Sequence, residues 1–245
     1  MTWSILARDP DSGLFGLAVA SRFFAVGALC PWSGGPHGAA MSQALPNPEL
    51  GARALMLLGQ GHRAGAVVEM LGGMDKGIEQ RQLHVIDADG GTAARTGTEC
   101  VAWCGSVSGD GISVAGNMLA GPRVIAATLA AYQAGAHLPI VERLLAAMQA
   151  GEDAGGDKRG KQAAALRIQG PECYARLDLR ADDHADPLAE LRRLYGVARE
   201  RSIPFSASLP CRARPYGILE RDIIEQIVER DAGKPLTAEV EIPEA

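Results

Sequence analysis

Thr2 combines a reactive side chain with a position from which that side chain could act. Threonine is small enough for a preceding Met1 to be removed, which would leave Thr2 with a nucleophilic hydroxyl and a free α-amine. That amine has an ordinary pKa of about 7.7–8.0, so it can act as a base near neutral pH. A threonine activated by its own amine is a known nucleophile. Because Met-Thr begins very many proteins, the interpretation depends on where the fold places Thr2.

Asn117 is the second catalytic candidate, because it follows Gly116 at the end of an expected strand. Its side-chain amide and a neighbouring backbone N–H could donate hydrogen bonds to a developing oxyanion. Glycine and asparagine are also common turn residues, so both interpretations stay open.

Six residues are candidates for binding a polar substrate. They are Arg8, Ser21, Gln43, Arg81, Asp157 and Arg159. The last two lie in a glycine-rich loop, residues 151–162, where an arginine could hold a charged group through two parallel hydrogen bonds. Ser21 and Gln43 could line a pocket beside Thr2. The competing interpretations are surface ion pairs for the arginines at strand ends and a solvated connector for the loop.

Metal-ligand residue types occur together in the run Asp182-Asp183-His184. Three adjacent residues rarely converge on one ion, so a charged loop before a helix at Asp186 is the better interpretation. Cys100 and Cys104 would share a strand face, but no second cysteine or histidine pair completes a zinc site. We therefore expect neither a metal nor a cofactor.

Strands are predicted first where turn formers separate short apolar runs. Thr2 leads into a hairpin, residues 3–8 and 14–21, as an edge strand, and the turn spans residues 9–13. Further strands are expected over residues 25–30, 38–43, 82–88, 92–96, 101–107, 112–116, 163–169 and 173–179.

Helices are predicted where apolar residues recur every three or four positions. They are expected over residues 50–58, 64–71, 124–132, 140–148 and 223–228, and from Asp186 onward, with the second ending at Gly72-Gly73. Asn47 and Asp186 are each followed by proline, which is typical of a helix start. Because helices come in pairs between groups of strands, the order disfavours a βαβ sheet. It predicts an α+β fold, a four-layer αββα sandwich of two antiparallel sheets with a helix pair on each outer face.

Length and composition indicate one globular domain of 245 residues, 47% hydrophobic. We expect this domain over residues 1–233, with a C-terminal helical extension from about residue 186 and a flexible tail over 234–245. A net charge of −5 with no basic run argues against a nucleic-acid partner. No apolar run approaches the roughly 20 residues of a membrane span. Five cysteines, with no CxxC pair, fit a reducing cytoplasm.

Specific motifs resemble those of the uncharacterised "domain of unknown function 1028" family over most of residues 2–195. They include residues 2–10, 16–21 and 25–27, Pro31-Trp32, Gln43, Asn47-Pro48, Arg81-Gln82, Thr96-Gly97, Cys100, Trp103, Gly116-Asn117, Leu119, Gly121, residues 155–162, Asp178-Leu179-Arg180 and Asp182-Asp183-His184. That family is grouped with the N-terminal nucleophile (Ntn) hydrolases, which implies the αββα fold, cleavage of amide bonds by Thr2 and assembly into a homo-oligomer.

The resemblance also implies roles for single residues. Gly116-Asn117 is similar to the oxyanion pair of glutamine amidotransferases in the same superfamily. The proteasome branch uses an aspartate in the second strand and a lysine about a strand later. Here the second strand ends Ala20-Ser21-Arg22 and the first lysine is Lys76, so that charge relay is not carried over.

Three functions follow as expectations. The first is an Ntn-type hydrolase acting on a small-molecule or peptide amide with Thr2 as nucleophile. The second is a non-catalytic small-molecule-binding or assembly protein that retains the fold. The third is a metal-dependent hydrolase using Asp182, Asp183 and His184.

Overall fold

Two antiparallel β-sheets form the centre of the computed structural model, which describes residues 2–237. The six-stranded sheet has the order β10-β9-β2-β1-β8-β7, and the four-stranded sheet has the order β3-β4-β5-β6. The larger sheet contains β1 (Thr2–Arg8), β2 (Phe15–Ser21), β7 (Gly105–Gly109), β8 (Ile112–Asn117), β9 (Ala163–Gln169) and β10 (Ala175–Ala181). The smaller contains β3 (Pro31–Ser33), β4 (Gly38–Ala44), β5 (Arg81–Asp87) and β6 (Thr92–Thr96).

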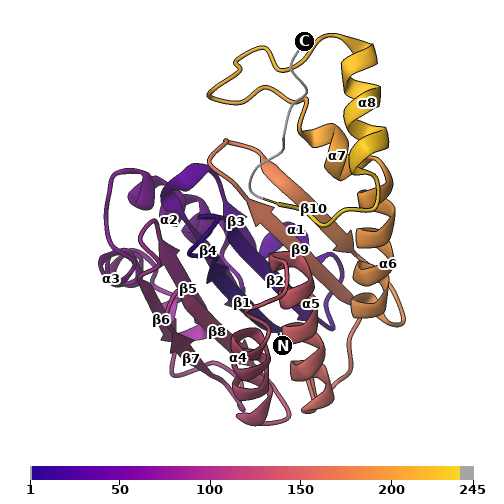
Figure 1. Ribbon diagram of the computed structural model, residues 1–245. Helices are drawn as coiled ribbons and strands as arrows, with labels where there is room; N and C mark the ends of the chain where they lie inside the picture. The colour runs from indigo at the N-terminus through magenta and orange to yellow at the C-terminus, as the bar shows by residue number, and fades with distance from the viewer. Residues whose placement is uncertain (1, 238–245) are drawn as a thin grey trace.

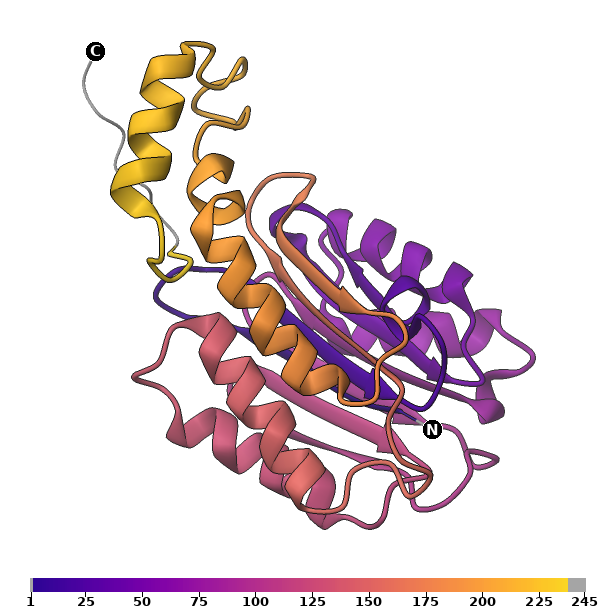
Figure 2. The same cartoon turned by 90° about the vertical axis from the view of Figure 1, so that its right-hand side faces the viewer.

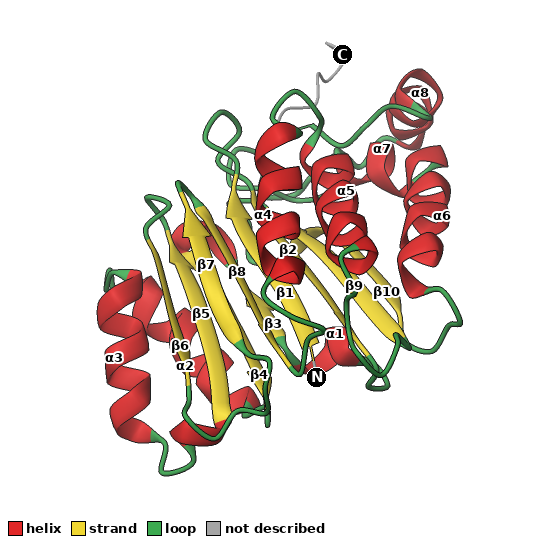
Figure 3. Ribbon diagram, turned by 90° about the horizontal axis from the view of Figure 1, so that it is seen from below, coloured by secondary structure: helices red, strands yellow, loops and turns green. Residues whose placement is uncertain are grey.

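Helices cover the outer face of each sheet, so the layers run α, β, β, α (Figures 1 and 3). The smaller sheet carries α2 (Pro48–Gly59) and α3 (Ala64–Met74). The larger sheet carries α4 (Arg123–Ala134), α5 (Ile140–Asp153) and α6 (Pro187–Glu200). The predicted α+β sandwich is confirmed, and α6 adds a third helix to the pair expected on the larger sheet.

Strand β1 is buried on both faces, and its side chains alternate between two cores. Trp3, Ile5 and Ala7 pack in the core under α4 and α5, whereas Leu6 packs in the core between the sheets together with Met41. This alternation is the ordinary period of a strand. It turns every second residue of β1, beginning with Thr2, toward the four-stranded sheet.

Local sequence features produce the expected turns and helix starts. The hairpin between β1 and β2 turns at Asp9, as predicted. The side chain of Asn47 accepts a hydrogen bond from the backbone N–H of Glu49 at the start of α2, at 3.1 Å. Asp186 accepts one from Ala189 at the start of α6, at 3.2 Å. Both caps satisfy backbone donors that the first helical turn leaves without partners.

Two predicted strands are corrected by the structure. Residues 25–30 do not form a strand but contain the short helix α1 (Val26–Leu29). Ala25 adopts a left-handed backbone with φ 52°, which turns the chain, and its N–H donates to Asp182 O at 3.0 Å. The strand expected over 101–107 begins only at Gly105. Before it, the carbonyls of Val101 and Trp103 accept hydrogen bonds from the segment after β8, which takes them out of the sheet.

Smaller differences occur at element ends. Helix α3 continues through Gly72-Gly73 to Met74, and the last strand begins at Ala175 rather than 173. The structure adds the short 3-10 helices η1 (Gly35–His37) and η2 (Ile78–Gln80) and the helix α7 (Ser202–Ser206).

Two tryptophans pack against glycines in the covering helices. A Cβ on Gly51 in α2 would overlap the indole of Trp32. A Cβ on Gly151 in α5 would lie 2.8 Å from Nε1 of Trp3. Glycine at these two positions lets each helix approach its sheet closely enough to bury a large aromatic ring.

The C-terminal part extends beyond the sandwich, where α7 and α8 (Arg221–Asp231) follow α6 (Figure 2). In the segment expected to be a tail, the side chain of Leu236 is buried and its backbone N–H donates to the hydroxyl of Tyr195 at 3.4 Å. The rest of that expected tail, residues 238–245, lies outside the described residues. Across residues 2–237, each helix is too short or too polar to cross a bilayer.

Candidate functional site

Thr2 lies at one end of the central strand of the larger sheet. It pairs with Ser21 of β2 on one side and with Asn117 of β8 on the other. The expectation of an edge strand is therefore corrected, because β1 is hydrogen-bonded along both edges. Thr2 is 5% exposed, and its hydroxyl oxygen is 3.3 Å from that of Ser21. Three of the predicted site residues thus meet at one strand end.

A layer of polar side chains lies between the sheets at this end. Each member occupies an inward-facing position of its strand, next to the apolar core described above. The members are Thr2, Ser4, Ser21, Gln43, Gln82, His84, Ser113 and Asn117, all buried. Burial of polar groups is costly unless they are hydrogen-bonded, so their mutual contacts decide whether the layer is stable.

Gln82 is the centre of this polar layer. Its Oε1 accepts hydrogen bonds from Asn117 Nδ2 at 3.1 Å and from Gln43 Nε2 at 2.8 Å. Its Nε2 lies 2.9 Å from the carbonyl oxygen of Gly116 and 3.1 Å from that of Gly105. One side chain therefore ties the smaller sheet to both strands at the edge of the larger one.

His84 lies deeper in the same layer and has a hydroxyl on each side. Its Nε2 is 2.8 Å from the Ser4 hydroxyl, and its Nδ1 is 3.0 Å from the Ser113 hydroxyl. Burial lowers the pKa of His84 to about 3, so the ring is neutral at physiological pH. The Ser4 hydroxyl also donates to Gln43 Oε1 at 2.7 Å, which joins His84 to Gln82 through two side chains.

A cavity of about 320 Å³ opens beside Asn117. Its walls are formed by Ala44, Leu45, Gln80, Glu99, Cys100, Val101, Asn117, Met118 and Arg159. Ala44 and Met118 both have left-handed backbones, with φ of 73° and 55°. Such conformations cost non-glycine residues about 1–3 kcal/mol and cluster at functional sites. Ala44 and Met118 both lie on the cavity wall, and Asn117, the last residue of β8, lines the same cavity. This cavity is therefore the candidate site.

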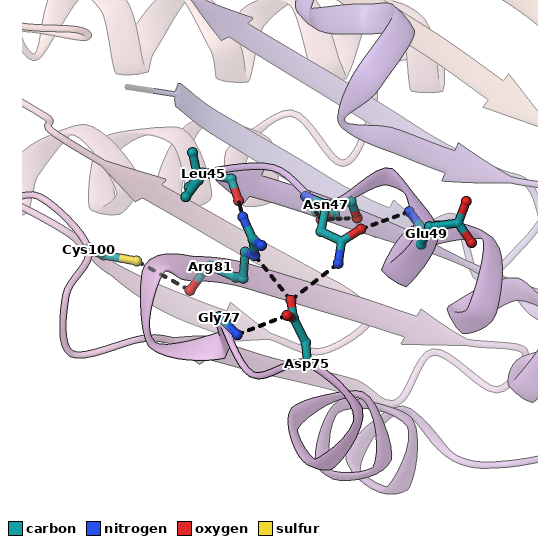
Figure 4. Close-up of polar contacts among 8 residues, drawn as sticks. Leu45, Asn47, Glu49, Asp75, Gly77, Arg81 and Cys100 are labelled. Carbon is teal, nitrogen blue, oxygen red and sulfur yellow. Dashed lines mark hydrogen bonds and ion pairs between the residues drawn. The ribbon is translucent and has the colours of Figure 1, made fainter.

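Arg81 is not among the residues that line this cavity, but it supports the cavity wall. Figure 4 shows its contacts with Leu45, Asp75 and Cys100. Its guanidinium donates to Asp75 at 3.0 Å and to the carbonyl of Leu45 at 2.6 Å. The Cys100 thiol donates to the Arg81 carbonyl at 3.2 Å. Arg81 thus joins two segments that line the cavity.

Asp75 is the partner that holds Arg81 in place. Burial acts to raise the pKa of Asp75, but hydrogen bonds from the Gly77 N–H, from Arg81 and from Asn47 outweigh it, and the pKa is lowered. The carboxylate therefore stays charged at neutral pH and keeps the ion pair. Cys100 behaves differently, because burial and the nearby Cys104 raise the pKa of its thiol.

Asp157 and Arg159 reach the site from the glycine-rich loop. The Asp157 side chain is fully buried and accepts hydrogen bonds from the backbone N–H of Arg22 at 3.1 Å and of Arg159 at 2.7 Å. Asp157 also forms a bridge with Leu119, just after β8. The loop is thereby fixed to the ends of β2 and β8. Arg159 lines the cavity, with its side chain 41% exposed and 3.4 Å from the Asp157 carboxylate.

Arg8 is separated from the other candidates. It ends β1, six residues from Thr2, which places it roughly 20 Å along the strand. There its backbone N–H donates to Gly111 O in the turn between β7 and β8. The fold therefore gathers Thr2, Ser21, Gln43, Asn117, Arg81, Asp157 and Arg159 at one end of the sandwich and leaves Arg8 at the other.

The residues of the metal hypothesis have other partners. Asp182 is paired with Arg180 at 2.6 Å, Asp183 accepts from Gln162 at 3.1 Å, and His184 Nδ1 accepts from the Asp186 N–H at 3.0 Å. Within residues 2–237, no three histidine, cysteine or acidic side chains are placed to hold one ion.

Sequence reasoning overlooked three members of the polar layer, Ser4, His84 and Ser113, and considered Gln82 only as part of the motif Arg81-Gln82. Their pattern is visible in the sequence, because each interrupts an apolar strand at an inward position, as in Gln82-Leu83-His84. A polar residue at every second position of a strand that is otherwise buried is the feature that could have revealed them.

Comparisons with known proteins agree on a family. The model of a family described as "Family of unknown function (DUF1028)" matches residues 2–191. The crystal structure of protein SPO2555 from Silicibacter pomeroyi, described with the same family, is 33% identical with a TM-score of 0.82, and the match covers 89% of this chain and 99% of that chain. No curated protein matches the chain.

Two further solved structures show a weak likeness. Anbu (ancestral beta-subunit) from Yersinia bercovieri is 12% identical with a TM-score of 0.38, covering 85% of this chain and 98% of that one. An Anbu (Gly-1) mutant from Hyphomicrobium sp. strain MC1 is 12% identical with a TM-score of 0.32, covering 82% and 96%. Neither likeness is strong enough to support an argument about function.

Proposed function

We propose that this chain, which belongs to the DUF1028 family of unknown function, hydrolyses an amide C–N bond with Thr2 as its nucleophile. The proposal is of the N-terminal nucleophile type and requires that Met1 be removed. One observation carries it: Thr2 and Asn117 are paired residues at the same strand end, and Asn117 lines the cavity. A nucleophile and an oxyanion donor need such a placement around one carbonyl group.

The chemistry would proceed through an acyl-enzyme. Thr2 Oγ1 attacks the carbonyl carbon of the amide while the Thr2 α-amine takes the hydroxyl proton. The tetrahedral intermediate then breaks its C–N bond, and the ammonium group returns the proton to the departing amine. Water, deprotonated by the same α-amine, attacks the Thr2 ester and releases the acid, which regenerates the hydroxyl.

Asn117 and Arg159 would supply binding and charge stabilisation. In the tetrahedral intermediate the former carbonyl oxygen is negative, and a side-chain N–H of Asn117 would donate to it. Arg159 lines the same cavity, and its guanidinium contacts Asp157 through Nη2 at 3.4 Å, so the other guanidinium nitrogens retain donors for a polar or anionic substrate group. Ser21, 3.3 Å from the Thr2 hydroxyl, would orient it.

Intact-mass measurement combined with an amide screen tests this proposal. Purified protein should lack Met1 and should release acid and amine from a member of a panel of small amides and short peptides. Thr2→Ser should keep measurable hydrolysis, whereas Thr2→Ala should lose it by about 100-fold or more. Thr92→Ala, at the far end of the sandwich, is the matched control and should retain full activity. Met1 fully retained, or hydrolysis unchanged in Thr2→Ala, would overturn the mechanism.

The active form would be a homo-oligomer in the cytoplasm that binds neither a membrane nor a nucleic acid. Light scattering on the purified chain measures the mass of the assembly. A monomer at micromolar concentration would contradict the oligomer.

A further inference from the structure

Two backbone carbonyls fix the orientation of the Gln82 side chain. The oxygens of Gly116 and Gly105 lie 2.9 and 3.1 Å from one end of its amide. A carbonyl oxygen only accepts hydrogen bonds, so the end that faces these two must be the NH2 group. The opposite end, which faces the polar layer, is therefore the oxygen Oε1.

The oxygen of Gln82 in turn fixes the two amides next to it. Gln43 and Asn117 each place a terminal atom 2.8 and 3.1 Å from that oxygen. Both atoms must be NH2 groups, because a carbonyl oxygen there would leave two acceptors facing each other in a buried layer. Gln43 then has its own oxygen at the far end, 2.7 Å from the Ser4 hydroxyl.

The single hydroxyl proton of Ser4 fixes the tautomer of His84. That proton is used toward Gln43, so at its 2.8 Å contact with His84 Nε2 the Ser4 oxygen can only accept. Nε2 therefore carries the ring proton. The other nitrogen, Nδ1, lies 3.0 Å from Ser113 and accepts from its hydroxyl. Full burial favours this neutral ring over the charged form, in agreement with its lowered pKa.

We propose that Gln82 is a positioning residue, whose Oε1 holds the Asn117 side chain with its NH2 group, and not its oxygen, toward Gln82. The same chain of hydrogen bonds, in which each donor faces an acceptor, holds His84 as the neutral Nε2–H tautomer. Asn117 gives one N–H to Gln82 and keeps the second for a ligand in the cavity. The group that meets this N–H is a hydrogen-bond acceptor, such as a carbonyl oxygen. The use of that N–H in catalysis rests on the proposed function, whereas the orientation itself does not.

Histidine 15N spectra of the full-length protein test the direction of the chain without any substrate. In the wild type, long-range 1H–15N correlations should show His84 protonated on Nε2 and unprotonated on Nδ1 at pH 7. Ser4→Ala removes the acceptor of the Nε2 proton, so the ring should shift to the Nδ1–H form that donates to Ser113. Ser42→Ala is the matched control, since the Ser42 hydroxyl is buried but bonds to the backbone of Asn47 instead. It should leave the tautomer unchanged.

Side-chain amide spectra test the role of Gln82. Gln82→Met keeps the volume of the side chain but removes its acceptor, so the Asn117 NH2 signals should move in this variant. Gln60→Met replaces an exposed glutamine and is the control, in which the Asn117 NH2 signals should not move. A wild-type His84 that is protonated on Nδ1, or Asn117 signals that do not move in Gln82→Met, would overturn the inference. The wild-type tautomer decides the matter even where a variant does not fold.

Kinetics separate this inference from the proposed function. With an amide substrate in hand, Gln82→Met should lower kcat by about tenfold or more while KM changes much less, because the amide is misoriented rather than absent. If Thr2→Ala keeps full hydrolysis, the proposed function fails while the tautomer result can still hold. If Thr2→Ala is inactive and Gln82→Met has the wild-type kcat, the positioning role fails and the proposed function stands.

Discussion

The Arg81 guanidinium and the Asp75 carboxylate form an ion pair at 3.0 Å in which both side chains are mostly buried, at 17% and 12% exposure. A second nitrogen of the Arg81 guanidinium, Nη1, donates to the carbonyl of Leu45, a residue that lines the cavity. We expect Asp75→Asn to lower the free energy of unfolding by about 1–3 kcal/mol, because it leaves Arg81 partly buried beside a neutral amide. Urea unfolding at pH 7 measures this.

The pH dependence of the same variant provides an internal check. The folded-state pKa of Asp75 is lowered from 3.8, so its contribution is present above pH 3.8 and is lost as the pH falls through the folded value. The gap between wild type and Asp75→Asn should therefore close in acid. Asp89→Asn, which breaks an exposed pair with Arg63, is the control and should change stability little. Equal effects of the two variants would contradict a structural role for Asp75.

His84 should make the protein less stable below neutral pH. Its pKa is about 3 in the folded state against 6.5 when exposed, so the unfolded chain takes up a proton first as the pH falls. Above pH 6.5 the ring is neutral in both the folded and the unfolded state, and the protein keeps its full stability. Below pH 6.5 the free energy of unfolding falls by roughly 1.4 kcal/mol per pH unit. Between pH 7 and pH 5 the wild type should lose ~2 kcal/mol more than His84→Gln. Parallel curves for the two proteins would mean that the ring is solvated.

Asn117→Asp should be more damaging than Asn117→Ala at neutral pH. The alanine variant removes a donor, whereas the carboxylate places a charged acceptor against Oε1 of Gln82. We expect the aspartate variant to be less stable than the alanine variant by about 1–3 kcal/mol at pH 7. Because protonation supplies the missing donor, the aspartate variant should recover stability as the pH is lowered. Urea unfolding at pH 7 and pH 5 distinguishes this from a simple loss of packing.

Gly51→Ala should destabilise the fold even though alanine is the better helix former. The new Cβ would meet the Trp32 ring, and overpacking of this kind costs about 1–3 kcal/mol. Gly196 is the control, because it lies within α6 with no heavy atom within 4 Å of a Cβ. Gly196→Ala should stabilise by about 0.5–1 kcal/mol. Thermal unfolding of the two variants should therefore shift in opposite directions.

Features set by neighbouring residues could be predicted from the sequence. The turn at Asp9 and the helix starts at Asn47 and Asp186 need only the residues that follow them. The layer order also follows from local periodicity. The structure of residues 25–30 could not be predicted in this way. Their backbone groups pair within a short helix, and the N–H of Ala25 pairs with the distant Asp182, which no local pattern indicates.

The candidate site could be predicted only in part, because its contacts join distant strands. Thr2 and Asn117 are candidates because of their chemistry, and their pairing depends on β8 lying beside β1, which no local pattern specifies. The role of Gln82 cannot be predicted from the motif Arg81-Gln82, because its partners come from Gln43, Gly105 and Asn117. Arg81 is a candidate substrate ligand in the sequence, but in the folded chain its guanidinium donates to Asp75 and to the Leu45 carbonyl.

The place of β1 between β2 and β8 has a consequence for the order of events during synthesis. The hairpin partner of Thr2 emerges within twenty residues, but the strand that closes its other edge ends at residue 117. At about 5–20 residues per second, the ribosome needs roughly 6 to 23 seconds to reach it. During this interval the edge of β1 that later pairs with β8 is open, so the burial of Thr2 between two neighbouring strands is completed late in synthesis.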